Sequence, residues 1–92
     1  MKNVQIIKPP ISKSIKCARV TLEPGEEIGE HVTDGCEEII VVLKGRVILV
    51  KEGKCLMLEQ GQAHFIGESI RHNVRNESEK EIEYVYVVSM LR

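Results

Sequence analysis

The chain lacks the features that would point to a membrane protein or a nucleic-acid-binding protein. Its only aromatic residues are Phe65, Tyr84 and Tyr86, which are too few for a platform that stacks bases. The 13 basic and 14 acidic residues nearly balance, giving a net charge of −1, so no basic surface is expected. No apolar run approaches the roughly 18 residues of a membrane span. We therefore expect no nucleic acid and no membrane among its partners.

Cysteine is also scarce. Three cysteines stand at positions 17, 36 and 55, and no two of them form a CxxC pair. The first residues, MKNVQIIKPP, lack the apolar stretch of a secretory signal peptide, so we expect a cytoplasmic protein with reduced thiols. Cys17 and Cys55 fall on predicted strands and are expected to be small buried hydrophobic residues. Cys36 is expected in a loop, where neighbouring acids make its thiol less acidic.

The composition predicts a β-rich fold. The chain has 11 Val and 11 Ile but only two Ala, and β-branched residues favour strands over helices. No long stretch repeats its apolar residues with the period of a helix. A length of 92 residues predicts one domain, 1–92, with a small core.

Short apolar runs alternate with turn signals along the whole chain. Gly45 and Gly53 stand where tight hairpin turns need a positive φ. Because the breaks leave no room for crossover helices, the strands should pair antiparallel in an all-β sandwich or barrel. The predicted strands are 4–7, 15–22, 28–32, 38–44, 46–51, 54–58, 63–66, 72–75 and 82–90.

Two of these runs, 39–43 and 84–88, are apolar on successive residues. One face of each strand would meet the interior, and the other face could meet a partner subunit or an exchanged N-terminal strand. The alternative is strand propensity with no oligomer. The first interpretation predicts a homodimer.

Two glycine-bounded patterns stand out from this background. Residues 25–45 read G-x5-H-x-T-x4-E-x6-G, and residues 61–76 read G-x5-G-x-S-x2-H-x3-N. Together and in this order they resemble the two motifs of the cupin family, in particular its small single-domain members of the cupin 2 type. The resemblance implies a double-stranded β-helix, or jelly-roll barrel, of antiparallel strands. It also implies a homodimer.

The resemblance further implies a metal site formed by His31, Glu38 and His72 inside the barrel. Imidazole and carboxylate groups suit divalent transition metals such as Zn, Fe, Mn or Ni. The chain departs from the family pattern at Thr33, where a second histidine is usual. It also has Gly67 in place of the usual proline and a serine in place of the following glycine. The two turn substitutions affect the fold little, whereas Thr33 removes one expected ligand.

This ligand set has one histidine fewer than the family pattern, and three outcomes are open for it. The metal stays on two histidines and one glutamate, with Thr33 bonding a metal-bound water or a substrate oxygen. Alternatively another residue fills the gap: Asp34 and Cys36 are near in sequence but fall in the loop, and His64 is a minority candidate beside the more usual interpretation of a half-buried strand histidine. Finally the metal is lost and the pocket binds an organic molecule, with Thr33 as a polar wall.

Two functions follow from these patterns. The first is a metal-binding cupin whose interior binds a small polar molecule, as a metal-dependent dioxygenase or isomerase would. The alternative is a non-catalytic small-molecule binding or sensing module, with or without metal. The cupin fold serves many activities, so the sequence leaves open whether the protein is an enzyme.

Overall fold

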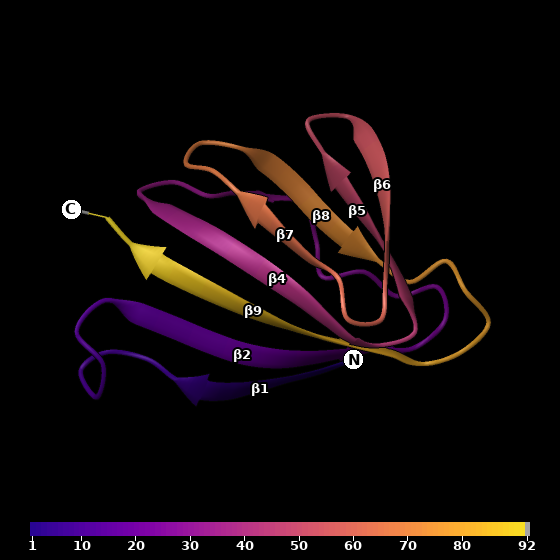
Figure 1. Ribbon diagram of the computed structural model, residues 1–92, viewed down its shortest axis with the longest axis horizontal. Coiled ribbons are helices and arrows are strands. Elements are labelled where there is room, and N and C mark those ends of the chain that lie inside the picture. Colours follow the sequence, from indigo (N-terminus) through magenta and orange to yellow (C-terminus); the bar gives the residue numbers. More distant parts are fainter. Residues whose placement is uncertain (92) are drawn as a thin grey trace.

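Residues 1–91, the part of the chain that the computed structural model describes, form nine β-strands in two antiparallel sheets (Figure 1). The strands are β1 (Lys2–Ile7), β2 (Ile15–Leu22), β3 (His31–Val32), β4 (Cys36–Lys44), β5 (Arg46–Lys51), β6 (Lys54–Glu59), β7 (Ala63–Ile66), β8 (Arg71–Arg75) and β9 (Ile82–Met90). Among these residues no helix is long and apolar enough to cross a membrane.

The first sheet has the strand order β1-β2-β9-β4-β7, and the second has the order β3-β8-β5-β6. Figure 1 shows the long strands β2, β9 and β4 side by side, with β5 and β6 as a hairpin in the second sheet. Every pair is antiparallel, which confirms the all-β expectation. Neighbours such as β2 and β9 are distant in sequence, so the first sheet is assembled by long-range strand pairing.

The core lies between the two sheets and consists of aliphatic side chains and one tyrosine. Its innermost members are less than 2% exposed: Val20, Leu22, Ile40, Val42, Val47, Leu49, Ile66, Ile82 and Tyr84. Burying each such side chain contributes about 1.5–3 kcal/mol, which makes this cluster the main source of stability. Along β4 and β5 buried residues alternate with more exposed ones, with the period of two expected for strands.

The predicted strand boundaries agree closely with the structure except at 28–32. There only β3 pairs continuously, while Glu27 makes an isolated bridge to Arg75. Gly29 adopts a φ of 111°, and its amide donates to the side-chain oxygen of Asn73 at 2.9 Å. This conformation breaks the ladder ahead of His31. The sequence reading missed it because Ile28 and Val32 look like strand residues.

The turns of both glycine-bounded patterns have clear steric reasons. Gly45 has a φ of 79°, and a Cβ placed there would lie 2.7 Å from Cγ2 of Ile82. Ser69, which replaces a glycine of the family pattern, takes a φ of 64° in the same left-handed region. Gly67, at the usual proline position, has no positive φ. Ser69 thus takes the left-handed conformation that a glycine would adopt most easily at this point of the turn.

Asn76 closes the second pattern as a buried structural residue. Its side-chain nitrogen donates to the carbonyl oxygens of Leu22 at 3.0 Å and Lys80 at 2.7 Å. Its side-chain oxygen accepts from the amide and the hydroxyl of Ser78. Because Asn76 is only 1% exposed, these bonds replace the water that its amide group would otherwise need.

Two side-chain expectations need correction or completion. Cys55, expected to be buried, is exposed, because it lies on the outward side of the edge strand β6. Cys17 is partly buried. The inward or outward direction of Arg19 is open from sequence, and its side chain is exposed on the outer face of the first sheet.

Candidate metal centre

His31 and His72 lie directly opposite each other on the paired strands β3 and β8. Side chains at opposite positions of an antiparallel pair project from the same face of the sheet. The two ring centroids are 4.1 Å apart, with an angle of 62° between the ring planes. His72 is 1% exposed, whereas His31 is exposed to solvent. One histidine therefore lies at the floor of the site and the other at its entrance.

Both imidazole rings are oriented by backbone carbonyl groups. The Nδ1 atom of His31 lies 2.9 Å from the oxygen of Gly29, and that of His72 lies 3.0 Å from the oxygen of Ile70. A carbonyl oxygen only accepts hydrogen bonds, so Nδ1 carries the proton in each neutral ring. Each Nε2 then keeps its lone pair. This tautomer is the one needed for coordination through Nε2.

Glu38 reaches the two histidines from the facing sheet. It lies on β4 and is 7% exposed. One of its carboxylate oxygens lies 3.3 Å from Nε2 of His72. Its neighbours across the sheet are Ile66 and Val88, which offer no polar partner. Burying a carboxylate in such surroundings is costly unless a cation or donor compensates.

The three side chains meet at one point. One ligand atom from each of His31, Glu38 and His72, hereafter the His-Glu-His cluster, lies within 4.8 Å of the others. The Nε2 atom of His72 is buried and has no hydrogen-bond partner among the described residues. A divalent cation between the three groups would satisfy this lone pair and neutralise the Glu38 carboxylate. The residues present therefore fit a two-histidine, one-carboxylate metal site.

The cluster also perturbs the titration of His72. Burial by itself lowers the pKa of His72, but the Glu38 carboxylate and the Ile70 carbonyl outweigh burial and raise the pKa overall. The imidazolium form is the one that both oxygens stabilise. A proton and a metal ion would thus compete for the same nitrogen.

Thr33 is buried beside the cluster, and backbone groups already use its hydroxyl. The hydroxyl donates to the carbonyl oxygen of Gly67 at 2.5 Å and accepts from the amide of Ile70 at 3.1 Å. The Thr33 amide in turn donates to the Ile70 carbonyl at 3.2 Å. Since a hydroxyl has one proton, Thr33 has no further proton to donate toward a ligand. These hydrogen bonds hold the turn at residues 33–36 against the loop before β8.

His64 faces the interior but stands apart from the cluster. It lies opposite the fully buried Ile40 on the inner side of the first sheet. Its Nε2 atom is 3.1 Å from the ammonium nitrogen of Lys51. Burial, and then the charge of Lys51, lower the pKa of His64. The His64 side chain therefore points into the interior, where it contacts Lys51 and lies outside the His-Glu-His cluster.

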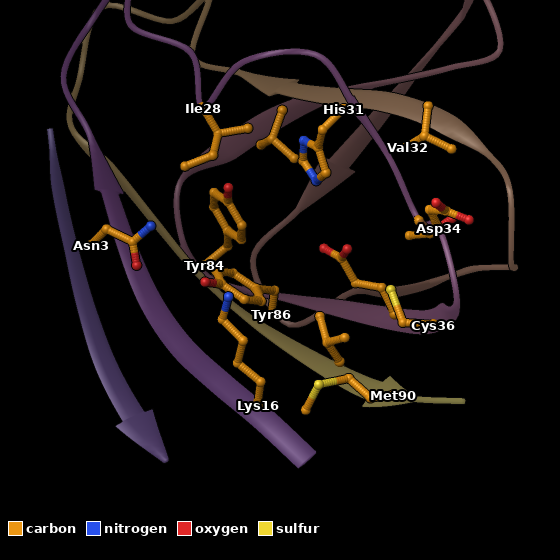
Figure 2. Close-up of a pocket in the computed structure, with 14 residues that line it drawn as sticks. Asn3, Lys16, Ile28, His31, Val32, Asp34, Cys36, Tyr84, Tyr86 and Met90 are labelled. Carbon is orange, nitrogen blue, oxygen red and sulfur yellow. The ribbon is translucent and has the colours of Figure 1, made fainter. Parts of the chain in front are cut away.

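A cavity of about 340 Å³ adjoins the cluster (Figure 2). His31 and Glu38 contribute to its wall, and its remaining polar lining comes from Asn3, Lys16, Thr33, Asp34, Cys36, Tyr84 and Tyr86. Its apolar lining consists of Ile28, Val32, Val74, Val88 and Met90. The volume suits a small molecule, and the cluster lies at one side of it.

Sequence reasoning missed the tyrosines and Lys16 as cavity residues. Tyr84 and Tyr86 project inward from β9, and burial is the main cause that raises the pKa of both hydroxyls, with the Glu38 charge adding to it. Lys16 lies on β2, on the same face as the buried Ala18. The alternation along β2 was the available signal, because residues two apart share a face.

Cys36 also lines the cavity, at the first position of β4 and not in the preceding loop as expected. Burial raises the pKa of its thiol, and the charges of Glu38, Asp34 and Glu68 raise it further. The thiolate form is therefore disfavoured at neutral pH. This agrees with the sequence-based expectation of a thiol made less acidic by its neighbours.

Comparison with known proteins identifies the family. Residues 18–88 match the family described as the cupin domain. This match covers most of the chain, so the protein belongs to the cupin family. No curated protein matches it significantly.

Solved structures with the same fold come from several bacteria. A predicted oxalate decarboxylase from Thermotoga maritima is 28% identical, with a TM-score of 0.79 over 83% of this chain and 66% of that one. The protein TT1209 from Thermus thermophilus is 24% identical, with a TM-score of 0.89 over 100% of this chain and 85% of that one. The cupin domain of an XRE family transcriptional regulator from Enterobacter cloacae is 18% identical, with a TM-score of 0.88 over 99% and 97%. This chain spans just under two thirds of the Thermotoga protein, and the two likenesses below 25% identity concern the fold alone.

Proposed function

We propose that this cupin binds one divalent transition metal through His31, Glu38 and His72 and uses the adjoining cavity to bind a small polar molecule. The observation that carries the proposal is the Nε2 atom of His72. It is buried, has no hydrogen-bond partner among residues 1–91, and lies 3.3 Å from a buried carboxylate. A buried nitrogen lone pair held this close to a carboxylate destabilises the fold unless a proton or a cation lies between them.

The chemistry would follow from the open side of the site. A bound metal with two histidines and one glutamate keeps positions free for other ligands and acts there as a Lewis acid. The exposed edge of His31 leaves access from solvent, and the carbonyls of Gly29 and Ile70 hold both rings in the coordinating tautomer. A dioxygenase or an isomerase acting on a small polar molecule is the enzyme class that this arrangement best supports.

Elemental analysis tests the metal site directly. Purified protein would be loaded in turn with Zn, Fe, Mn and Ni, freed of excess ion, and compared with His72→Ala and His64→Ala variants. We expect about one metal per chain in the wild type and in His64→Ala, and none in His72→Ala. His64→Ala is the matched control because it removes an interior histidine outside the cluster.

Two results would overturn this proposal. Wild-type protein that takes up none of the four metals would remove the metal from the function altogether. Equal loss of metal in both histidine variants would show that the binding is not at the cluster.

A second candidate function, a binding or sensing module without catalysis, is favoured by the state of Thr33. Its only hydroxyl proton is given to the Gly67 carbonyl, so it cannot donate to a reacting molecule. Water-proton relaxation of the Mn-loaded protein separates the two candidates. Rapidly exchanging metal-bound water is expected of a catalytic site, and its absence favours the binding module.

We also propose a homodimer that packs through the outer face of the first sheet. There Phe65, Ile39 and Val87 form one cross-strand row, and the first two are 54% and 44% exposed. Val4 and Ile6 on the edge strand β1 are similarly exposed. Sedimentation equilibrium with Ile39→Lys tests this surface, and a wild type that sediments as a monomer at every concentration would exclude it.

We further propose that residues 1–92 form one domain and that the protein is cytoplasmic, where its three cysteines would stay reduced.

A further inference from the structure

We propose that Lys16 forms an anion-binding end of the cavity, opposite the metal, so that the bound molecule is a small acid with one group on the metal and a carboxylate on Lys16. This inference rests on the proposed function, because it requires a metal at the His-Glu-His cluster. It adds the chemical class of the ligand and the residue that selects it.

The register of the first sheet puts Lys16 in the same cross-strand row as Glu38. Val88 on β9 pairs with Glu38 on one side and with Lys16 on the other. All three side chains therefore project from the inner face. Two strand spacings separate the backbones of Lys16 and Glu38, about 9.6 Å. A small molecule can bridge a gap of this size across Val88.

The charges that line the cavity support an anionic ligand only when a metal is bound. Among the lining residues, Lys16, Asp34 and Glu38 are charged, so the metal-free cavity has one more negative than positive charge. A divalent ion at the cluster reverses that sign. Within residues 1–91 no carboxylate forms an ion pair with Lys16, so its ammonium group is available to a ligand.

The groups around Lys16 suit a carboxylate with a short apolar chain. Figure 2 shows the Lys16 side chain extending in the direction of Tyr86, with Asp34 on the far side of the cavity. Tyr86 and Asn3 lie at this end, and each brings a polar hydrogen to it. Val88 separates this end from Glu38, so methylene groups of a bridging molecule would contact an apolar side chain. The cavity of about 340 Å³ limits the ligand to a small acid.

Titration calorimetry with two acids of equal chain length tests the inference. Succinate carries carboxylates at both ends, whereas butyrate has only one, so the second carboxylate is the sole charge that Lys16 could select. Both would be titrated into Zn-loaded wild type, Lys16→Gln, Lys16→Arg and Lys13→Gln, with Zn chosen because it is redox-inert. Lys13→Gln removes a lysine outside the cavity.

We expect the wild type to bind succinate at least tenfold more tightly than butyrate, because a charge-assisted hydrogen bond is worth about that factor. The preference should disappear in Lys16→Gln, persist in Lys13→Gln and largely return in Lys16→Arg. Metal-free wild type should bind neither acid.

The outcomes distinguish this inference from the proposed function. Zn uptake without succinate binding, or with a preference that Lys16→Gln leaves unchanged, overturns the role of Lys16 and leaves the metal site standing. Failure of the wild type to take up Zn overturns both.

Discussion

Replacing Glu38 with glutamine should stabilise the metal-free protein at alkaline pH and abolish its stabilisation by metal. Glutamine has nearly the shape of glutamate, so the packing around a side chain that is 7% exposed is preserved. Its amide group can donate to Nε2 of His72, which has no partner among the described residues of the wild type. The substitution also removes a buried negative charge that only a metal or a proton on His72 would balance.

The size of the effect follows from the unsatisfied atom. A buried polar group without a partner costs about 1–3 kcal/mol, and we take the lower value because the new hydrogen bond must form at 3.3 Å or shorten slightly. For a domain of this length, 1 kcal/mol corresponds to a rise in Tm of about 4–8 °C. Metal at 100 times its Kd would stabilise the wild type by about 2.7 kcal/mol, and the variant by little.

The sign of the effect should reverse with pH. Because Glu38 and the Ile70 carbonyl raise the pKa of His72 in the folded state, its protonation stabilises the fold. That stability is fully present below the unfolded histidine pKa of about 6.5 and is lost as pH rises through the folded-state pKa. The Glu38→Gln variant should therefore be less stable than wild type at about pH 5.5 and more stable at about pH 8.5.

Thermal unfolding is followed by circular dichroism at both pH values, with EDTA or with Zn. It measures the stability of the metal-free variant, the reversal of its sign with pH, and the rise in Tm that metal causes. Glu37→Gln is the matched control, since it removes the same charge from the neighbouring residue, whose side chain faces away from the cluster. A Glu38→Gln variant that is less stable than wild type at every pH, or that keeps the full metal-induced rise in Tm, would refute the reasoning.

Two further predictions concern a turn and the cysteines. Gly45→Ala should lower the free energy of unfolding by about 1–3 kcal/mol more than Gly53→Ala, as measured by urea titration. The two glycines share a φ of 79°, but only at Gly45 would the new Cβ meet Ile82, at 2.7 Å, and equal losses would contradict this steric account. Iodoacetamide should alkylate the exposed Cys55 well before Cys36, because burial and nearby acids raise the pKa of the Cys36 thiol. Mass spectrometry of partly modified protein would show the order, and modification of Cys36 first would be the contrary result.

The strand pattern was readable from the sequence because it depends on local chemistry. The predicted strands at 46–51 and 82–90 agree with β5 and β9 at both ends, since each contains a continuous apolar run with turn residues before it, Gly45 in the first case and the polar NESEK stretch in the second. At 28–32 the same reasoning was wrong. The left-handed conformation of Gly29 is supported by a hydrogen bond from its amide to Asn73, a residue 44 positions away.

The candidate metal ligands were also named from sequence, through the spacing of the two glycine-bounded patterns. The resemblance also implied that they meet inside the barrel, and the structure brings them within 4.8 Å of one another although Glu38 lies in one sheet and His31 and His72 lie in the other. The hydrogen bonds of the Thr33 hydroxyl, by contrast, depend on carbonyl and amide groups in the loop before β8. Spacing along the chain does not report which backbone groups a hydroxyl will find.

Lys16 shows most clearly which features are local to the sequence and which depend on the folded chain. Its place two residues before Ala18 is enough to put both side chains on one face of a strand, because side chains alternate along it. The assembled sheets were needed to make this face the inner one, and to place Lys16 in the row of Glu38 through Val88. Alternation is a local property of the backbone. The identity of the inner face depends on which distant strands pair and which sheet covers them, and those contacts form only when the whole chain has folded.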